Sequence, residues 1–354
     1  MTKAELDNRK ILPLEDSWYR RVKEKLDGIA KPLDGLGKFE HLIAQIGAIE
    51  KTTKISIQKK AVLVMCADNG VVEEQVSQSG KEVTLAVAKA MGVNNSSVGK
   101  MAAVAGVDVI PVDIGIDTDE VIPGVLPRKV AKGTKNFAKE PAMTEEEVLK
   151  AIETGIQLVQ QCHREGYEIL ATGEMGIGNT TTSTAVAAAL LDLEVEQVTG
   201  KGAGLTDEAL KRKCRVIEEA IEKYSLRDAD AFTILKTVGG LDIAGLTGVF
   251  IGAAIEQIPV VIDGVISAVA ALLAETLCKG AVNYMIPSHK SRELAETEIM
   301  KKLHLDPVLD ADMALGEGTG AVMMMSLLDV ALGVYLQGAS FANFEIEQYK
   351  RYEE

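Results

Sequence analysis

Apolar residues along the chain fall into short runs and longer periodic stretches, and their alternation predicts an α/β fold. The short runs AVLVMC, VDVIPVDIGI, YEILATGEM and IPVVID are rich in Val, Ile or Met and end in polar residues or glycine. Such runs are typical of buried parallel strands. Longer stretches with helical spacing separate them, so the order of strand, turn and helix predicts a parallel sheet covered by helices.

Helices are also predicted where the chain carries start and stop signals. Two amphipathic segments, at 16–27 and 36–50, lie on either side of the breaker KPLDGLGK and precede the first strand. Thr144 and Glu147 form a capping box that predicts a helix to about residue 165. Residues 117–142 are rich in Pro, Gly and charge, and a solvated loop is predicted there.

Polar side chains recur at the carboxyl ends of the predicted strands. Asp68, Asp113, Glu174 and Asp263 each follow or end an apolar run. The carboxyl ends of parallel strands meet at one edge of a sheet, where α/β proteins bind ligands. Asp68 is followed by Asn-Gly, which is also ordinary turn chemistry, so both interpretations stay open for that residue.

The strongest local signal is the glycine-rich turn GEMGIGNTTT at 173–182, between a strand and an Ala-rich helix. Its free N–H groups and its hydroxyls at the helix N-terminus predict a site for a phosphate monoester. It fits neither the Walker pattern, because Gly178 is followed by Asn179-Thr180, nor the dinucleotide fingerprint, which needs a third glycine. Glu174 would repel a phosphate, so we interpret it as a partner of a sugar hydroxyl or of the reacting base.

A second glycine-rich turn, GKGAG at 200–204, leads to a helix that Thr206 opens. Lys201 and Lys213 bring positive charge to this region, although a basic helical face is more often simply solvated. His289 follows a serine, but the nucleophile elbow of hydrolases does not occur in the sequence. It is interpreted as structural or as a sugar contact.

A third glycine-rich turn, GEGTG at 316–320, holds Glu317 directly before an apolar helix-forming stretch. Thr319 is predicted to cap that helix. Glu317 is either a general base at the floor of a pocket, shielded by neighbours such as Leu315 and Met323, or an ordinary member of a solvated turn.

Composition narrows the function. With 354 residues, 47% hydrophobic and only 4% aromatic, the chain can build a large aliphatic core as one large domain or two ordinary ones. The net charge of -14 argues against nucleic-acid and anionic-membrane partners and favours small molecules. The cysteines lack CxxC spacing, so neither a zinc site nor a disulfide framework is predicted. The N-terminus lacks an apolar signal core, and a cytoplasmic enzyme is predicted.

Eight longer motifs carry a family resemblance over nearly the whole chain. In order, they are PLDGLGKFE (32–40), CADNGV (66–71), GEMGIGNTTTS (173–183), GKGAG (200–204), VGGLDIAGL (238–246), PVVIDGVISAVAALLA (259–274), PSHKS (287–291) and LGEGTGA (315–321). Together they resemble the nicotinate-nucleotide:dimethylbenzimidazole phosphoribosyltransferase family, which activates the lower-ligand base of cobamides.

The resemblance implies a Rossmann-like large domain at 56–324 and a smaller helical domain built from 1–55 and about 325–354. The implied reaction moves 5-phosphoribosyl from nicotinate mononucleotide to a benzimidazole nitrogen, releasing nicotinate and giving an α-riboside 5′-phosphate. The pyridinium nitrogen of the donor is already cationic, so neither a metal nor another cofactor is expected. The family acts as a dimer, which predicts a homodimer or a heterodimer with a homologous subunit.

The same resemblance implies roles for particular residues. Glu317 would be the catalytic base, supported by Glu174 and Lys213. The residues expected at the phosphoribosyl group are Gly176, Gly178, Asn179, Thr180, Gly202, Gly204, Asp263, Ser291 and Gly316. Those expected at the acceptor base are Ser77, Ser79, Gly80, Met175 and Leu315.

One loop departs from the family pattern. The family usually has Val-Ser-x-aromatic-Pro-x-Glu-Val-Thr where this chain has residues 76–84, with Ser79 in place of the aromatic residue and Gly80 in place of the proline. Loss of the ring removes a flat stacking wall. The alternatives are therefore transfer to another acceptor, such as adenine, a phenol or p-cresol, possibly as one subunit of a heteromer, or a non-catalytic partner subunit.

Overall fold

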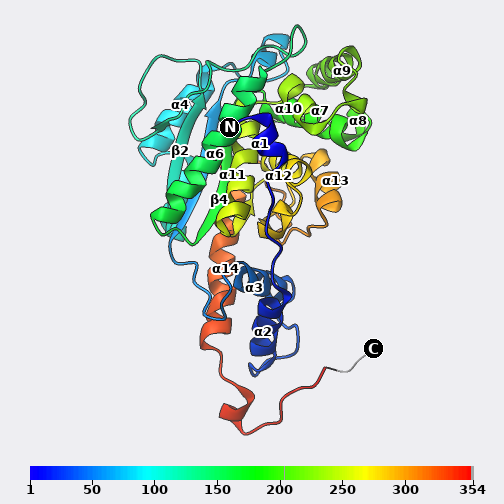
Figure 1. Cartoon of the computed structure of the whole chain (residues 1–354). Helices are drawn as coiled ribbons and strands as arrows, with labels where there is room; N and C mark the ends of the chain where they lie inside the picture. Colours follow the sequence, from blue (N-terminus) through cyan, green and yellow to red (C-terminus); the bar gives the residue numbers. More distant parts are fainter. Residues whose placement is uncertain (203, 352–354) are drawn as a thin grey trace.

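The computed structural model of the chain describes residues 1–202 and 204–351, which carry a six-stranded parallel sheet (Figure 1). In spatial order the strands are β3 (Leu126–Pro127), β2 (Val107–Gly115), β1 (Lys60–Ala67), β4 (Ile169–Met175), β5 (Val260–Ile262) and β6 (Met285–Pro287). The central β1 pairs with β2 on one side and with β4 on the other, and all these pairs are parallel. This is the strand order of a Rossmann fold, and it confirms the predicted α/β class.

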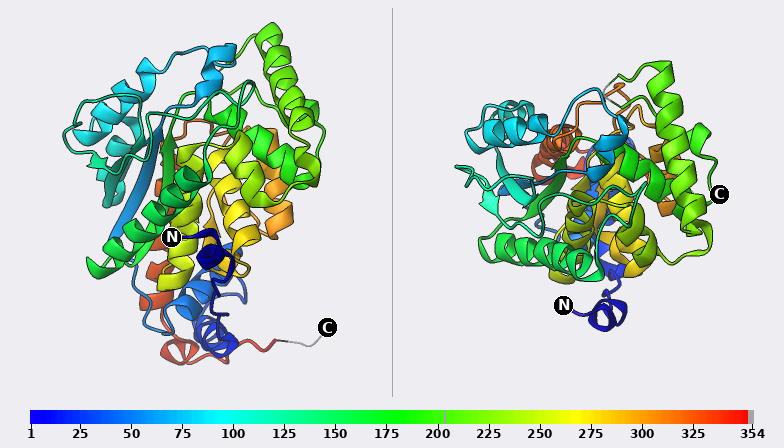
Figure 2. Two further views of the ribbon diagram at one scale, coloured as in Figure 1. Left: turned by 45° about the horizontal axis from the view of Figure 1, so that its top comes forward. Right: turned by 90° about the horizontal axis from the view of Figure 1, so that it is seen from above.

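The helices cover both faces of the sheet (Figure 2). In chain order they are α1 (Lys3–Asp7), α2 (Asp16–Asp27), α3 (Lys38–Ile49), α4 (Glu82–Gly92), α5 (Ser97–Ala105), α6 (Glu145–Arg164), α7 (Asn179–Leu191), α8 (Val195–Val198), α9 (Asp207–Lys223), α10 (Ala231–Val238), α11 (Leu241–Glu256), α12 (Val265–Leu277), α13 (Leu294–Leu303) and α14 (Thr319–Gln337). The predicted capping box at Thr144 is present and begins α6.

Side chains of β1 alternate between two cores because successive strand residues face opposite sides of a sheet. Leu63 and Met65 join the core under α6, α7, α11 and α12, whereas Val62 and Val64 join the core under α3, α4, α5 and α14. The whole strand is buried. Burial on both faces explains why its sequence is a continuous apolar run with no polar alternation.

A helical unit lies beyond one end of the sheet, where α2 and α3 pack beside the second half of α14 (Figure 1). The hydroxyl of Tyr335 on α14 donates a hydrogen bond to the carbonyl oxygen of Thr53 at 2.9 Å. The predicted division into two domains stays a prediction. Within the part assigned to the smaller domain, Leu6 of α1 is buried in the sheet-bearing core and the Met1 amino group pairs with Glu153 of α6 at 2.8 Å.

Length and composition alone would let α14 cross a membrane, but 56% of its most apolar 18-residue stretch is buried within the fold. Its buried side chains, including Met324, Met325 and Leu328, belong to the core beneath β1. A core helix of an α/β domain explains the same pattern.

Helices α6 and α11 pack backbone to backbone through glycines. A Cβ added at Gly155 would lie 2.1 Å from the carbonyl oxygen of Gly245, and one added at Gly248 would lie 2.0 Å from that of Ile152. Both contacts are far inside van der Waals distance and involve backbone atoms, which cannot move aside cheaply.

We therefore expect Gly155→Ala to lower the free energy of unfolding by about 2 kcal/mol or more, as measured by urea denaturation. Gly333→Ala on α14 is the matched control, since an added Cβ there meets nothing within 4 Å. The control should gain about 0.5–1 kcal/mol from the better helix propensity of alanine. Equal stability of the two variants would contradict the close packing of α6 on α11.

Candidate active site

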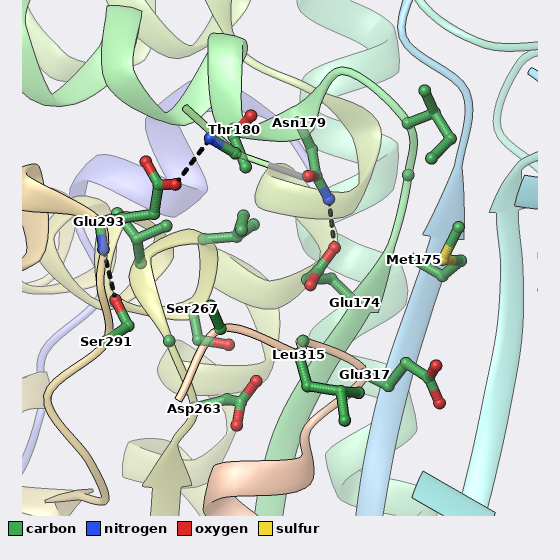
Figure 3. Close-up of a pocket in the computed structure, with 18 of the residues that line it drawn as sticks. Glu174, Met175, Asn179, Thr180, Asp263, Ser267, Ser291, Glu293, Leu315 and Glu317 are labelled. Atoms are coloured by element: carbon green, nitrogen blue, oxygen red, sulfur yellow. Dashed lines mark hydrogen bonds between the residues drawn. The ribbon is translucent and has the colours of Figure 1, made fainter. Parts of the chain in front are cut away.

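A cavity of about 230 Å³ opens at the carboxyl ends of β4 and β5 (Figure 3). Its walls come from residues 174–180, 263–267, 289–293 and 314–317, together with Gly202. The strand order runs outward in both directions from the boundary between β1 and β4. A crevice beside such a reversal is where open α/β sheets bind ligands, so the topology itself marks this cavity as the candidate site.

Most of the residues predicted from the sequence line this cavity. They are Glu174, Met175, Gly176, Asn179, Thr180, Gly202, Asp263, Ser291, Leu315, Gly316 and Glu317. Gly178 and Ser77 line a smaller cavity of about 80 Å³ on the other side of the 176–180 turn. Lys213, Gly204, Ser79 and Gly80 line neither cavity.

The turn after β4 has the geometry that its glycines predict. Gly178 adopts a φ of 92° and forms the N-cap of α7, and the N–H of Asn179 donates to the carbonyl oxygen of Gly176 at 3.0 Å. A Cβ at Gly176 would lie 2.5 Å from the carbonyl oxygen of Ala67, so the turn can pass β1 only as glycine. Gly173 has a different role from the one predicted. It lies within β4, and a Cβ there would meet the carbonyl oxygen of Glu317 at 2.6 Å.

Lys213 on α9 is fully buried behind the cavity wall. Its Nζ donates to Thr180 Oγ1 at 3.0 Å and to the carbonyl oxygen of Gly200 at 3.2 Å, so it joins the two glycine-rich turns. Burial lowers the pKa of its ammonium group, and the nearby carboxylate of Glu293 opposes that shift. In this arrangement Lys213 supports the turn that carries Thr180 and does not itself face the cavity.

Glu293 places a negative charge at the second glycine-rich turn. Its Oε1 accepts a hydrogen bond from the N–H of Gly202 at 3.1 Å (Figure 3). A carboxylate on this backbone donor marks the turn as a place where an anion can be held. The sequence pattern did not single out Glu293, because a lone acid between Arg292 and Leu294 carries no motif.

Glu317 stands in a strained turn at the start of α14. Its φ is 61°, and its neighbours Gly316 and Gly318 have φ values of 83° and 89°. The left-handed conformation costs a non-glycine residue about 1–2 kcal/mol. One carboxylate oxygen, Oε2, accepts the N–H of Val98 in the first turn of α5 at 2.9 Å, and no described protein group donates to Oε1. One oxygen is therefore anchored while the other can accept a proton.

Two expectations about this turn are corrected. Thr319 is the first residue of α14 and Gly318 is the N-cap; the Thr319 hydroxyl donates to the carbonyl oxygen of Gly316 at 2.8 Å. Leu315 and Met323 are 52% and 38% exposed, so they do not enclose Glu317 within this chain. The side chain of Glu317 instead turns toward α5, away from Asp263 (Figure 3).

Asp263 stabilises the same turn by accepting three backbone hydrogen bonds. Its Oδ2 accepts the N–H of Gly318 at 3.2 Å, and its Oδ1 accepts those of Gly320 at 2.8 Å and Ala321 at 3.1 Å. These are free N–H groups of a helix N-terminus, where a carboxylate is favourable. Asp263 was predicted to contact phosphoribosyl, but its hydrogen bonds go to α14. Burial raises the pKa of this carboxyl, while the nearby His289 opposes the rise.

Glu174 is the penultimate residue of β4, and its carboxyl group lies in the middle of the cavity wall (Figure 3). Its Oε2 accepts a hydrogen bond from the side-chain amide of Asn179. Burial raises the pKa of Glu174 to about 8; the Asn179 amide opposes this shift, and the charges of Asp242, Asp263 and Glu317 add to it. A carboxyl group with that pKa is mostly neutral at pH 7 and can donate a hydrogen bond.

The predicted acceptor loop lies outside the main cavity. Gln78 donates to the carbonyl oxygen of Gly204, and the N–H of Ser79 donates to Ser77 Oγ at 3.3 Å. The first of these hydrogen bonds holds the loop against the second glycine-rich turn, and the second lies within the loop. Of the predicted acceptor residues, only Met175 and Leu315 line the main cavity.

His289 and Ser267 complete the site without a strong sequence signal. Both are buried and line the cavity. His289 Nδ1 lies 3.0 Å from Ser288 Oγ, and a Cβ at Gly320 would come within 2.1 Å of the same ring nitrogen. His289 thus packs beneath the start of α14, in agreement with the structural role considered for it.

Comparisons with known proteins agree on one family. A family model described as phosphoribosyltransferase matches residues 11–346. The nicotinate-nucleotide–dimethylbenzimidazole phosphoribosyltransferase of Acetivibrio thermocellus is 45% identical over 93% of this chain and 94% of its own. The protein of that name from Clostridium acetobutylicum is 43% identical over 95% and 96%. A crystal structure of the enzyme from Thermus thermophilus has a TM-score of 0.88 at 33% identity, covering 95% of this chain and all of its own.

Proposed function

Because the chain belongs to the phosphoribosyltransferase family of these relatives, we propose that its cavity transfers 5-phosphoribosyl from nicotinate mononucleotide to dimethylbenzimidazole. The products are nicotinate and an α-riboside 5′-phosphate, the activated lower-ligand base of a cobamide. The observation that carries this proposal is a carboxylate with one free oxygen, that of Glu317, beside two glycine-rich turns that can hold a phosphate.

The proposed reaction needs one general base and no general acid. The pyridinium nitrogen of the donor leaves as a neutral pyridine nitrogen, so no acid has to protonate it. As one azole nitrogen attacks the anomeric carbon, Glu317 Oε1 takes the proton from the other nitrogen. Attack from the side opposite the leaving group inverts the β-riboside to an α-riboside. The site residues assigned from the resemblance remain proposals, as does the absence of a metal or cofactor.

The phosphate of the donor is proposed to lie against the turns at 176–180 and 200–202. Asn179 and Thr180 stand at the N-terminus of α7, where free N–H groups and the helix dipole favour an anion. Lys213 holds the Thr180 hydroxyl in place. The carboxylate of Glu293 on Gly202 would have to leave that donor before a phosphate could use it.

The purified protein is expected to convert nicotinate mononucleotide and dimethylbenzimidazole to nicotinate and the riboside phosphate. Liquid chromatography with mass spectrometry would follow both products. A panel with benzimidazole, adenine and p-cresol tests the acceptor, since Ser79 and Gly80 replace the usual aromatic residue and proline. Release of nicotinate with p-cresol but not with dimethylbenzimidazole would overturn the assignment of the acceptor. The absence of transfer to every acceptor would favour a non-catalytic subunit.

We also propose a cytoplasmic homodimer, with a heterodimer of homologous subunits as the alternative. Exposed apolar side chains on α14 and its turn, Leu315, Met323 and Val330, are consistent with a partner surface there. Small-molecule substrates, without nucleic acid or membrane, remain the proposed partners. Light scattering of the purified protein would separate monomer from dimer.

A further inference from the structure

Asp242 is a buried acid that the proposed reaction does not use. It is the second residue of α11, in the motif VGGLDIAGL, and its side chain is fully buried. The glycines around it make room for the carboxylate. A Cβ at Gly176 would lie 2.9 Å from Asp242 Oδ2, and one at Gly240 would lie 2.3 Å from Oδ1. The chain therefore keeps a desolvated carboxylate directly beneath the turn of the candidate active site.

Asn179 bridges this acid to Glu174. Its amide nitrogen donates to Asp242 Oδ2 at 3.1 Å and also to Glu174 Oε2. An amide NH₂ has two hydrogens, and the two carboxyl groups take both. With the amide turned over, its oxygen would face two acceptors, so Asp242 fixes which way Asn179 points. Asn179 in turn holds the carboxyl of Glu174 at the cavity wall.

We propose that Asp242 is a positioning residue that orients Asn179 and, through its charge, keeps Glu174 as a neutral hydrogen-bond donor facing the cavity. This inference rests on the proposed function of the site. Nicotinate mononucleotide carries a phosphate and a carboxylate, and an ionised Glu174 would set another negative charge against them. A neutral Glu174 can instead donate to an oxygen of the substrate, and its proton stays on the carboxyl throughout the reaction.

The charges around Glu174 favour the neutral form. The charged groups that shift its pKa are Asp242 from α11, Asp263 after β5 and Glu317 before α14, all of them acidic. Asp242 itself faces Asp68; burial raises its pKa to about 6, opposed by hydrogen bonds from Asn179 and from the backbone of Ile243. Asp242 is thus mostly charged at pH 7 while Glu174, with a pKa of about 8, is mostly neutral.

The pH dependence of kcat/KM tests this role. Neutral Glu174 is present below its pKa and is lost as pH rises through about 8. Asp242→Ser removes a nearby charge but keeps an acceptor for Asn179. It is expected to move the basic limb of the profile to lower pH by about one unit or more. The control Asp192→Ser removes a charge from an exposed ion pair with Arg227 and should leave the limb in place.

A double-mutant comparison separates this role from a general loss of structure. Glu174→Gln stays neutral at every pH and still donates, so it is expected to lose the basic limb and to be less impaired than Glu174→Ala. In the double variant, adding Asp242→Ser to Glu174→Gln should then cause no further shift of the pH profile of kcat/KM. The proposal is wrong if Asp242→Ser lowers kcat/KM equally at all pH values. It is also wrong if Asp242→Ser shifts the pH profile as much in the Glu174→Gln variant as in the unmodified protein.

An infrared measurement needs neither turnover nor a stable Asp242 variant. The difference spectrum between the unmodified protein and Glu174→Gln at pH 7 is expected to show the C=O stretch of a protonated carboxyl. Only a carboxylate band at that pH would overturn the proposal. If the band is present in a protein that transfers no phosphoribosyl, the proposed function fails while the assignment of the proton on Glu174 stands.

Discussion

Replacing Glu317 by glutamine is expected to lower kcat for phosphoribosyl transfer by about 10²–10⁴-fold, the usual contribution of a general base. Glutamine keeps the length of the side chain and an oxygen that can accept the N–H of Val98, the contact that Glu317 makes at 2.9 Å. The turn should therefore keep its shape, and the KM for nicotinate mononucleotide should change little. Steady-state kinetics with both substrates varied would measure the two effects separately.

Glu317→Gly provides a second arm of this experiment. Glycine adopts a φ of 61° without strain, so the variant should fold at least as well while lacking the carboxylate. Added formate is then expected to restore part of the activity by acting as the missing base. Unchanged turnover in Glu317→Gln, with an active unmodified protein, would remove Glu317 from the base role and direct attention to Glu174.

The sequence predicted those parts of the fold that a local pattern of apolar residues marks. Strands β1, β2, β4 and β5 were predicted because each lies in a run rich in Val, Ile or Met that ends in polar residues or glycine. The edge strands β3 and β6, of two and three residues, were missed because no longer apolar run surrounds them, whereas the equally short β5 lies within the run IPVVID. β3 lies in the segment 117–142, which was predicted as a loop.

The site was predictable in part for a related reason. Parallel strands bring their carboxyl ends to one edge, which placed Glu174 and Asp263 together from the sequence pattern alone. The same rule was too broad for Asp113, which lies two residues before the end of β2 and pairs with Lys129 at 3.2 Å outside the main cavity. The rule predicts only which residues lie at the same edge of the sheet. Side-chain contacts decide which of those residues line the same cavity.

The contacts that give each acid its role are not encoded in short motifs. The partner of Glu317 is a backbone N–H of Val98, 219 positions away, and backbone groups leave no signature in the sequence. Asn179 and Asp242 are 63 positions apart and meet because the first residues of α7 and α11 lie together in the fold. The sequence therefore identified the acids, whereas the roles proposed for them, as a base, a helix cap and a neutral donor, depend on tertiary packing.

Removing the carboxylate of Asp263 is expected to have the largest effect on stability. Asp263→Ala would leave three buried N–H groups at the start of α14 without their acceptor, those of Gly318, Gly320 and Ala321. Each unpaired buried group costs about 1–3 kcal/mol, so we expect a loss of about 3 kcal/mol or more in the free energy of unfolding. Urea denaturation would measure it, with the largely exposed Asp310 replaced by alanine as the control.

The kinetics of the variant Asp263→Asn separate a helix cap from a substrate ligand. The side-chain oxygen of asparagine can still accept two of the three N–H groups, but its NH₂ would face the third. We expect an intermediate loss of stability and a fall in kcat, because the strained turn that carries Glu317 loses part of its support. The KM for nicotinate mononucleotide should stay nearly constant. A rise in that KM with kcat and stability unchanged would instead assign Asp263 to phosphoribosyl binding, as the family resemblance implied, and the cap would then be incidental.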